Sequence, residues 1–122
     1  MASEAIHRAE ALANRDHAEW LISEKSGDPV AMRWAATAIF YSAMHAVSAF
    51  LVAQNINVSS HQDRADVMDD PALGIPEDVR NAYQYLKRRS VGARYHARLF
   101  SVGELRYLID VRLATILTYF RV

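Results

Sequence analysis

The residues best suited to chemistry lie close together, in residues 81–105. Six basic residues and no acidic one occur between Asp78 and Glu104, although the 14 basic and 14 acidic side chains of the whole chain balance. Guanidinium groups bind phosphate oxygens through paired hydrogen bonds, and aromatic rings stack on unpaired bases. The stretch therefore predicts a site for phosphate or single-stranded nucleic acid. The predicted binding residues are Lys87, Arg88, Arg94, Arg98 and Tyr95.

The same cations have a second interpretation, as the polar end of a helix. Lys87, Arg88 and Arg89 fall in the predicted last turn of a helix, where positive charge offsets the helix dipole. Arg94 and Arg98 are expected in the linker that follows, beyond the reach of that dipole. The structural and the ligand-binding interpretations therefore both stay open.

The histidines and acidic residues outside this stretch show no pattern typical of a metal site. His45 lies within an apolar helix and is expected to be a hydrogen-bonded structural residue, and His61 is expected to brace a loop. Glu4 and His7 form one Glu-x-x-His pair, whereas a di-iron bundle needs two such pairs and further inward-facing glutamates. We therefore expect no metal and no cofactor.

The element that must position these residues is an uncharged segment, Trp34–Asn55. No Asp, Glu, Lys or Arg occurs between Arg33 and Asp63, and apolar residues cover most faces of a helix drawn through the segment. A helix that is apolar nearly all round is buried nearly all round. The segment is long enough to span a membrane. Its many alanine and hydroxyl residues, and the lack of a flanking basic cluster, favour instead the core of a soluble protein that binds no membrane.

Capping and turn residues divide the chain into helices. The sequence predicts a first helix over residues 3–26 and a second from Pro29 to about Asn55, and Ser60 is expected to cap a short helical turn that runs through Met68. Residues 69–76 are expected to be irregular. A third helix should open at Pro76 and stop near Ser90, before Gly92.

A last helix is predicted over residues 101–121, opened by a capping box of Ser101 and Glu104. No segment alternates with period two. The predicted fold is all-α, one domain over residues 1–122. It is expected to be an antiparallel four-helix bundle with an extra short helical turn between helices 2 and 3. The absence of cysteine suits a cytoplasmic protein.

Several short motifs give the chain a resemblance to the HEPN family of small helical bundles, found in prokaryotic toxin–antitoxin, nucleotidyltransferase-associated and defence systems. They are Trp34 followed by the aromatic-small-His pattern of residues 40–46, Ser60-His61, and the basic segment 87–96. The resemblance covers most of the chain. It implies a homodimer packed through helices 2 and 3, with a shared cleft.

In active HEPN proteins, an arginine and a histidine separated by four to six residues form a metal-independent ribonuclease site. Arg89 and His96 match that spacing, so the resemblance implies that His96 acts as general acid or base and that Arg89 holds the scissile phosphate. The pattern departs from the active members at Ser90, where they carry Asn, Asp or His. Three functions therefore stay open: an RNA-binding protein or ribonuclease, a non-catalytic module that pairs with a nucleotidyltransferase-like partner, and a ligand-binding bundle lined by Trp20, Trp34 and tyrosines.

Overall fold

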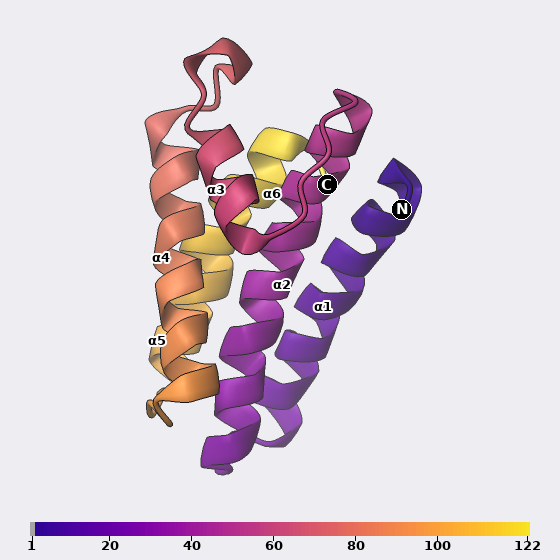
Figure 1. Ribbon diagram of the computed structural model, residues 1–122. Coiled ribbons are helices and arrows are strands. Elements are labelled where there is room, and N and C mark those ends of the chain that lie inside the picture. Colours follow the sequence, from indigo (N-terminus) through magenta and orange to yellow (C-terminus); the bar gives the residue numbers. More distant parts are fainter. Residues whose placement is uncertain (1) are drawn as a thin grey trace.

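A computed structural model describes residues 2–122, and every regular element in that range is helical (Figure 1). The elements are α1 (Glu4–Glu24), α2 (Pro29–Ala53), α3 (His61–Met68), the 3₁₀ turn η1 (Pro71–Leu73), α4 (Glu77–Tyr95), α5 (Val102–Tyr107), the π-helical segment η2 (Leu108–Leu113) and α6 (Ala114–Phe120). The last three follow one another without a break and form one long helix. The all-α class is confirmed.

Helix α2 is the centre of the fold, as its composition predicts. It packs against α1, α4 and the last helix, and successive long helices run in opposite directions (Figure 1). Ile39, Phe40, Val47 and Leu51 are fully buried. By length and composition α2 could span a membrane, but 72% of its most apolar window is buried inside the fold. Such burial is typical of the core helix of a soluble protein.

Small residues let α1 approach α2 closely. Ala11 and Ala18 of α1 and Ala35 of α2 are fully buried. The buried Ser42 hydroxyl donates a hydrogen bond of 2.6 Å to the Ala11 carbonyl, so this polar group within the seam has a partner.

The predicted helix starts are confirmed at the atomic level. The side chains of Ser3, Asp28, Ser60 and Ser101 each accept a hydrogen bond from a backbone N–H of the helix that follows. The stretch 69–76, predicted to be irregular, contains the single 3₁₀ turn η1, which Asp70 caps in the same way.

The predicted end of the third helix is wrong, because α4 continues past Ser90 and Gly92 to Tyr95. Gly92 does not stop the helix. It lets the chain fold back over the helix end: the backbone N–H groups of His96 and Arg98 both donate to the Gly92 carbonyl, each at 3.1 Å. A Cβ at Gly92 would lie 3.0 Å from Cδ of Arg98. Arg94 consequently lies in the last helical turn and not in the linker.

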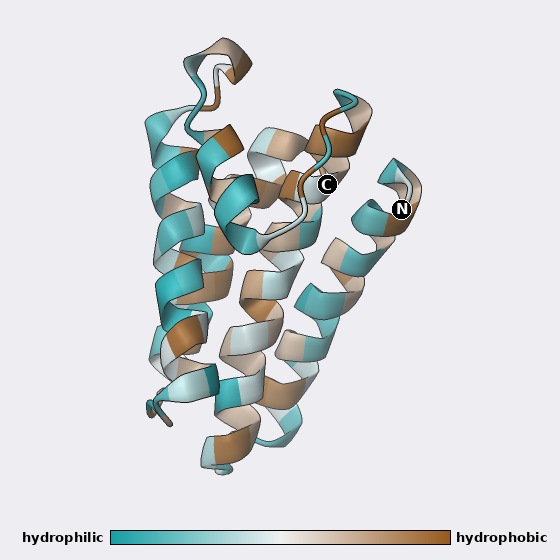
Figure 2. Ribbon diagram, viewed as in Figure 1, coloured by the Kyte–Doolittle hydropathy of each residue, from teal (hydrophilic) through white to brown (hydrophobic). Residues whose placement is uncertain are grey.

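Segment 54–76 folds back along the molecule, so that α3 lies beside α2 and α4 (Figure 1). The ring centroids of His61 and Phe40 are 5.6 Å apart, which joins the start of α3 to the middle of α2. In Figure 2, α3 and α4 carry mostly hydrophilic residues, whereas α2 is mainly pale or brown.

Candidate phosphate-binding site

Two of the predicted arginines are neutralised by one carboxylate. Glu104 Oε2 lies 2.8 Å from Arg98 Nη2 and 3.4 Å from Arg89 Nε, and the three side chains are each about two-thirds or more buried. The hydrogen bond to Glu104 raises the pKa of Arg98. The predicted capping box is therefore only half formed. The Ser101 hydroxyl accepts from the Glu104 N–H, but the Glu104 carboxylate binds these arginines.

Arg89 and His96 are not brought together within one chain. Arg89 extends toward the preceding helical turn, where its Nη2 donates to the Tyr85 hydroxyl at 3.1 Å. His96 is the C-cap residue of α4, and it is exposed. At 1.5 Å per residue, it lies about 10 Å from Arg89 along the helix axis. No hydrogen bond joins the two side chains in residues 2–122.

Arg94 is held at the end of α4 by aromatic and hydroxyl groups. Its guanidinium carbon lies 5.1–6.0 Å from the ring centroids of Phe40, Tyr41 and Tyr95. Its nitrogens donate to the Ser90 carbonyl and hydroxyl, at 3.3 and 3.2 Å. These contacts fix the side chain without neutralising its charge. Because Arg94 lies in the last helical turn, the helix dipole also contributes to its position.

The remaining predicted binding residues lie on the same end of α4. Lys87 is half-buried, and Arg88 and Tyr95 are exposed. Within residues 2–122, no carboxylate lies within ion-pair distance of Lys87, Arg88 or Arg94. These three cations are therefore the ones whose charge is available to an anion.

A pocket of about 280 Å³ lies between the first turns of α2 and the last turn of α4. Arg33, Trp34 and Thr37 line it from α2, and Ala93 and Arg94 from α4. Trp34 is 59% exposed, although it belongs to the uncharged segment that was expected to be buried nearly all round. We call this the Trp34 pocket. It brings an exposed aromatic residue and two arginines to one pocket.

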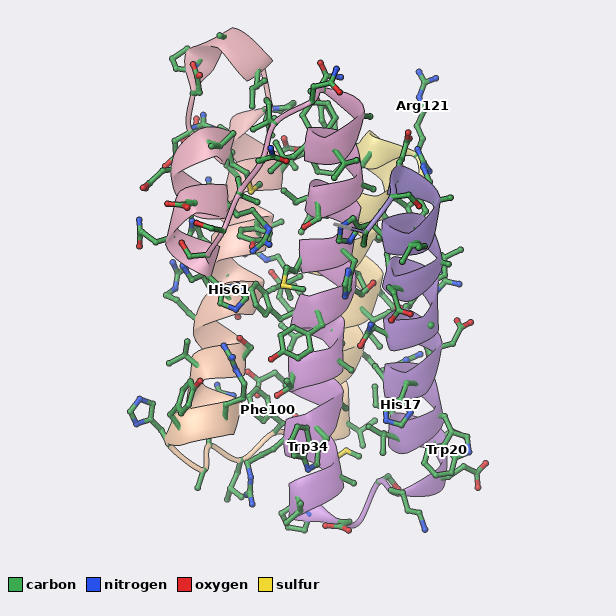
Figure 3. The ribbon with its side chains drawn as sticks, turned by 45° about the vertical axis from the view of Figure 1, so that its right-hand side comes forward. His17, Trp20, Trp34, His61, Phe100 and Arg121 are labelled. Carbon is green, nitrogen blue, oxygen red and sulfur yellow. The ribbon has the colours of Figure 1, made fainter. Side chains whose placement is uncertain are left out.

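Above this pocket, His61 and Arg64 of α3 continue the polar face. The His61 ring packs on Phe40, and its Nδ1 lies 3.3 Å from Arg64 Nη1. Figure 3 shows His61 and Trp34 on the side of the molecule that faces the viewer. Burial, followed by the charges of Arg64, Arg94 and Lys87, lowers the pKa of His61. All three cations therefore lie near enough to His61 to disfavour its protonated form.

His45 is bound to a residue that the sequence did not single out as its partner. The Nδ1 atoms of His45 and His7 lie 3.0 Å apart, at hydrogen-bond distance. His45 is half-buried, so it lies at the edge of the core. Among residues 2–122, no three His, Asp or Glu side chains gather in a way that could hold a metal ion.

No family model, curated protein or solved structure matches this chain. The functional argument therefore depends on the site itself.

Sequence reasoning missed Arg33 as a site residue, and it named Trp34 only as a lining residue of a possible ligand-binding bundle. The composition of segment 34–55 predicted a helix that is buried nearly all round, Trp34 included, and Arg33 was treated only as the boundary of that segment. Both residues lie within the first two turns of α2, on a side of the helix that the fold leaves partly or fully exposed. A large aromatic residue next to an arginine near a helix start is the signal that could have marked them.

Proposed function

We propose that this chain binds single-stranded RNA or nucleotide phosphates on the face that runs from the Trp34 pocket to Lys87. The single observation that carries the proposal is that the exposed Trp34 lines one pocket together with Arg33 and Arg94. A base that stacks on an aromatic side chain gains about 1–3 kcal/mol, and adjacent arginines bind the phosphates on either side.

The proposed context is a cytoplasmic, HEPN-like four-helix bundle that dimerises through α2 and α4. The central position of α2, the antiparallel long helices and the basic end of α4 support this architecture. Light scattering should then report twice the chain mass of 13.8 kDa. A monomer at micromolar concentration would argue against the dimer, but not against binding.

The contacts of Arg89 favour RNA binding without cleavage. Its guanidinium is occupied by Glu104 and Tyr85, and within one chain no second group positions His96. We therefore expect that a labelled single-stranded RNA stays intact when it is incubated with the protein without metal. Cleavage that Arg89→Ala and His96→Ala each abolish would instead assign the ribonuclease function. The non-catalytic pairing with a nucleotidyltransferase-like partner remains the alternative to RNA binding.

Salt dependence of RNA affinity tests the proposal. For a single strand, each phosphate contact contributes about 0.7 to the slope of log K against log salt. The variants Arg33→Gln and Arg94→Gln should each make that negative slope shallower by about 0.7. Fluorescence anisotropy of a labelled oligonucleotide measures it. Arg15→Gln is the matched control, because Arg15 lies on α1 and pairs with Asp16. Equal slopes for all three variants would contradict the proposal.

A further inference from the structure

A second pocket, of about 230 Å³, lies where α3 and the loop before it meet the ends of α1 and α2. Its walls are mainly aliphatic: Leu51, Val52, Ile56 and Val58. Its polar side is formed by Arg64, Ser48 and His7. We call this the Arg64 pocket. Ser48 and Arg33 are fifteen residues apart on α2, so this pocket is about 22 Å from the Trp34 pocket along the helix axis.

Arg64 brings a positive charge to this pocket without a carboxylate to offset it. Its Nε donates to the Ser48 hydroxyl at 3.1 Å, and its Nη1 lies 3.3 Å from His61 Nδ1. Among residues 2–122, no Asp or Glu lies within ion-pair distance of Arg64. The side chain is half-buried. A charge held partly out of water is costly unless an opposite charge is supplied, and a guanidinium pairs well with a carboxylate or a phosphate.

The histidines around Arg64 do not supply that opposite charge. His7 and His45 share one hydrogen bond through their Nδ1 atoms, so one ring donates there and the other accepts. The ring that accepts carries its own proton on Nε2 and can donate from that atom. Of the two, only His7 lines the pocket, and a neutral imidazole contributes one further hydrogen-bond donor or acceptor there and no negative charge.

We propose that the Arg64 pocket binds a small organic carboxylate with a branched aliphatic body. The carboxylate pairs with the Arg64 guanidinium, and the body lies against Val52, Ile56 and Val58. Inorganic phosphate fits less well, because it would leave the aliphatic walls in contact with water. The carboxylate belongs either to a free acid or to the C-terminus of a peptide. This site is independent of RNA binding at the Trp34 pocket.

Calorimetric titration with 4-methylpentanoate tests the proposal. The acid should bind at least tenfold more tightly than 4-methylpentanamide and than inorganic phosphate. Arg64→Gln should weaken binding at least tenfold, with its fold checked by circular dichroism. Lys25→Gln, which removes an exposed charge at the end of α1, should leave the affinity unchanged. Binding that is equal for the acid and the amide, or that survives Arg64→Gln, would overturn the proposal.

A second variant keeps the charge and fills the pocket. Val52→Phe should weaken the binding of 4-methylpentanoate at least fivefold while Arg64 is retained, and unchanged affinity would overturn the assignment to this pocket. A short peptide that ends in leucine, compared with its C-terminal amide, distinguishes the two sources. Tighter binding of the free peptide than of 4-methylpentanoate assigns a peptide C-terminus, and weaker binding assigns the free acid.

Discussion

Glu104 decides which of the clustered arginines a ligand can reach. It is bound to Arg89 and Arg98, and this leaves Lys87, Arg88 and Arg94 as the accessible cations on α4. The sequence shows that positive charge gathers at residues 80–98, but it cannot show that a residue beyond the cluster neutralises part of it.

Removal of the Glu104 charge should have two opposite effects. Glu104→Gln should lower the free energy of unfolding by about 1–2 kcal/mol, because two partly buried guanidinium groups lose their partner. It should also tighten RNA binding at low salt, because both arginines become available to phosphates. Urea denaturation and anisotropy measure the two effects. Asp110→Asn, at an exposed residue, is the control and should change neither.

The Trp34 pocket shows where periodicity alone misleads. Trp34 lies in the segment expected to be buried nearly all round, yet it is 59% exposed, although Met32 and Ala35 beside it are buried. His7 was likewise considered only as one half of a Glu-x-x-His pair with Glu4, and it lies at hydrogen-bond distance from His45, 38 residues along the chain. Both errors concern contacts between elements, which depend on how far each helix extends past the next.

The turn after α4 stores backbone strain at Ala97. Its φ of +50° lies in the left-handed region, which costs a residue with a Cβ roughly 1–2 kcal/mol. Glycine removes that cost, but it loses more conformational freedom on folding than alanine does, which costs about 0.5–1 kcal/mol. Ala97→Gly should therefore raise the free energy of unfolding by about 0.5–1 kcal/mol in urea denaturation. Ala13→Gly, in the exposed middle of α1, should lower it by a similar amount. A lower free energy of unfolding for Ala97→Gly would contradict the assignment of backbone strain to Ala97.

The seam between α1 and α2 depends on small side chains. Ala35 is fully buried and lies two turns before Ser42, on the side of α2 that bonds to α1. Ala35→Leu should lower the free energy of unfolding by about 1–3 kcal/mol, because the added atoms have no space. Ala53→Leu, at the exposed end of α2, should change it little, and urea denaturation compares the two variants. Equal effects would show that the seam is not closely packed at Ala35.

The helical framework of the whole molecule could be predicted well, because local chemistry determines it. Asp28 and Pro29 start α2, Ser101 starts the last helix, and an uncharged α2 requires neighbours on several sides. The end of α4 could not be predicted. Gly92 is a usual helix stop, and only the approach of Arg98 to Gly92 explains why the helix continues there.

The stability of the whole fold should depend on pH through three histidines. The pKa values of His7, His45 and His61 all lie below the ordinary value of 6.5, first because of burial and then because of nearby charges that include Arg64. The unfolded chain therefore binds protons more readily than the folded one. The resulting stability is present above pH 6.5 and is lost as the pH falls through the lowered values.

Thermal unfolding between about pH 7.5 and pH 5 measures this dependence. The melting temperature should fall with pH, and His7→Gln should make that fall shallower. His17→Gln, at an exposed histidine stacked on Trp20, should leave the dependence unchanged. A melting temperature that does not change over this range would contradict the assignment of the pH dependence to these three histidines.

The fluorescence of Trp34 tests the central claim most directly. The chain has two tryptophans, so Trp20→Phe leaves Trp34 as the single reporter. A single-stranded RNA should quench its emission, with the same binding curve that anisotropy gives. Trp34→Ala should weaken binding about five- to hundredfold, equivalent to about 1–3 kcal/mol of stacking, whereas Trp20→Ala should leave it unchanged. RNA that binds without quenching Trp34, or that binds Trp34→Ala as tightly as the unaltered chain, would contradict the account.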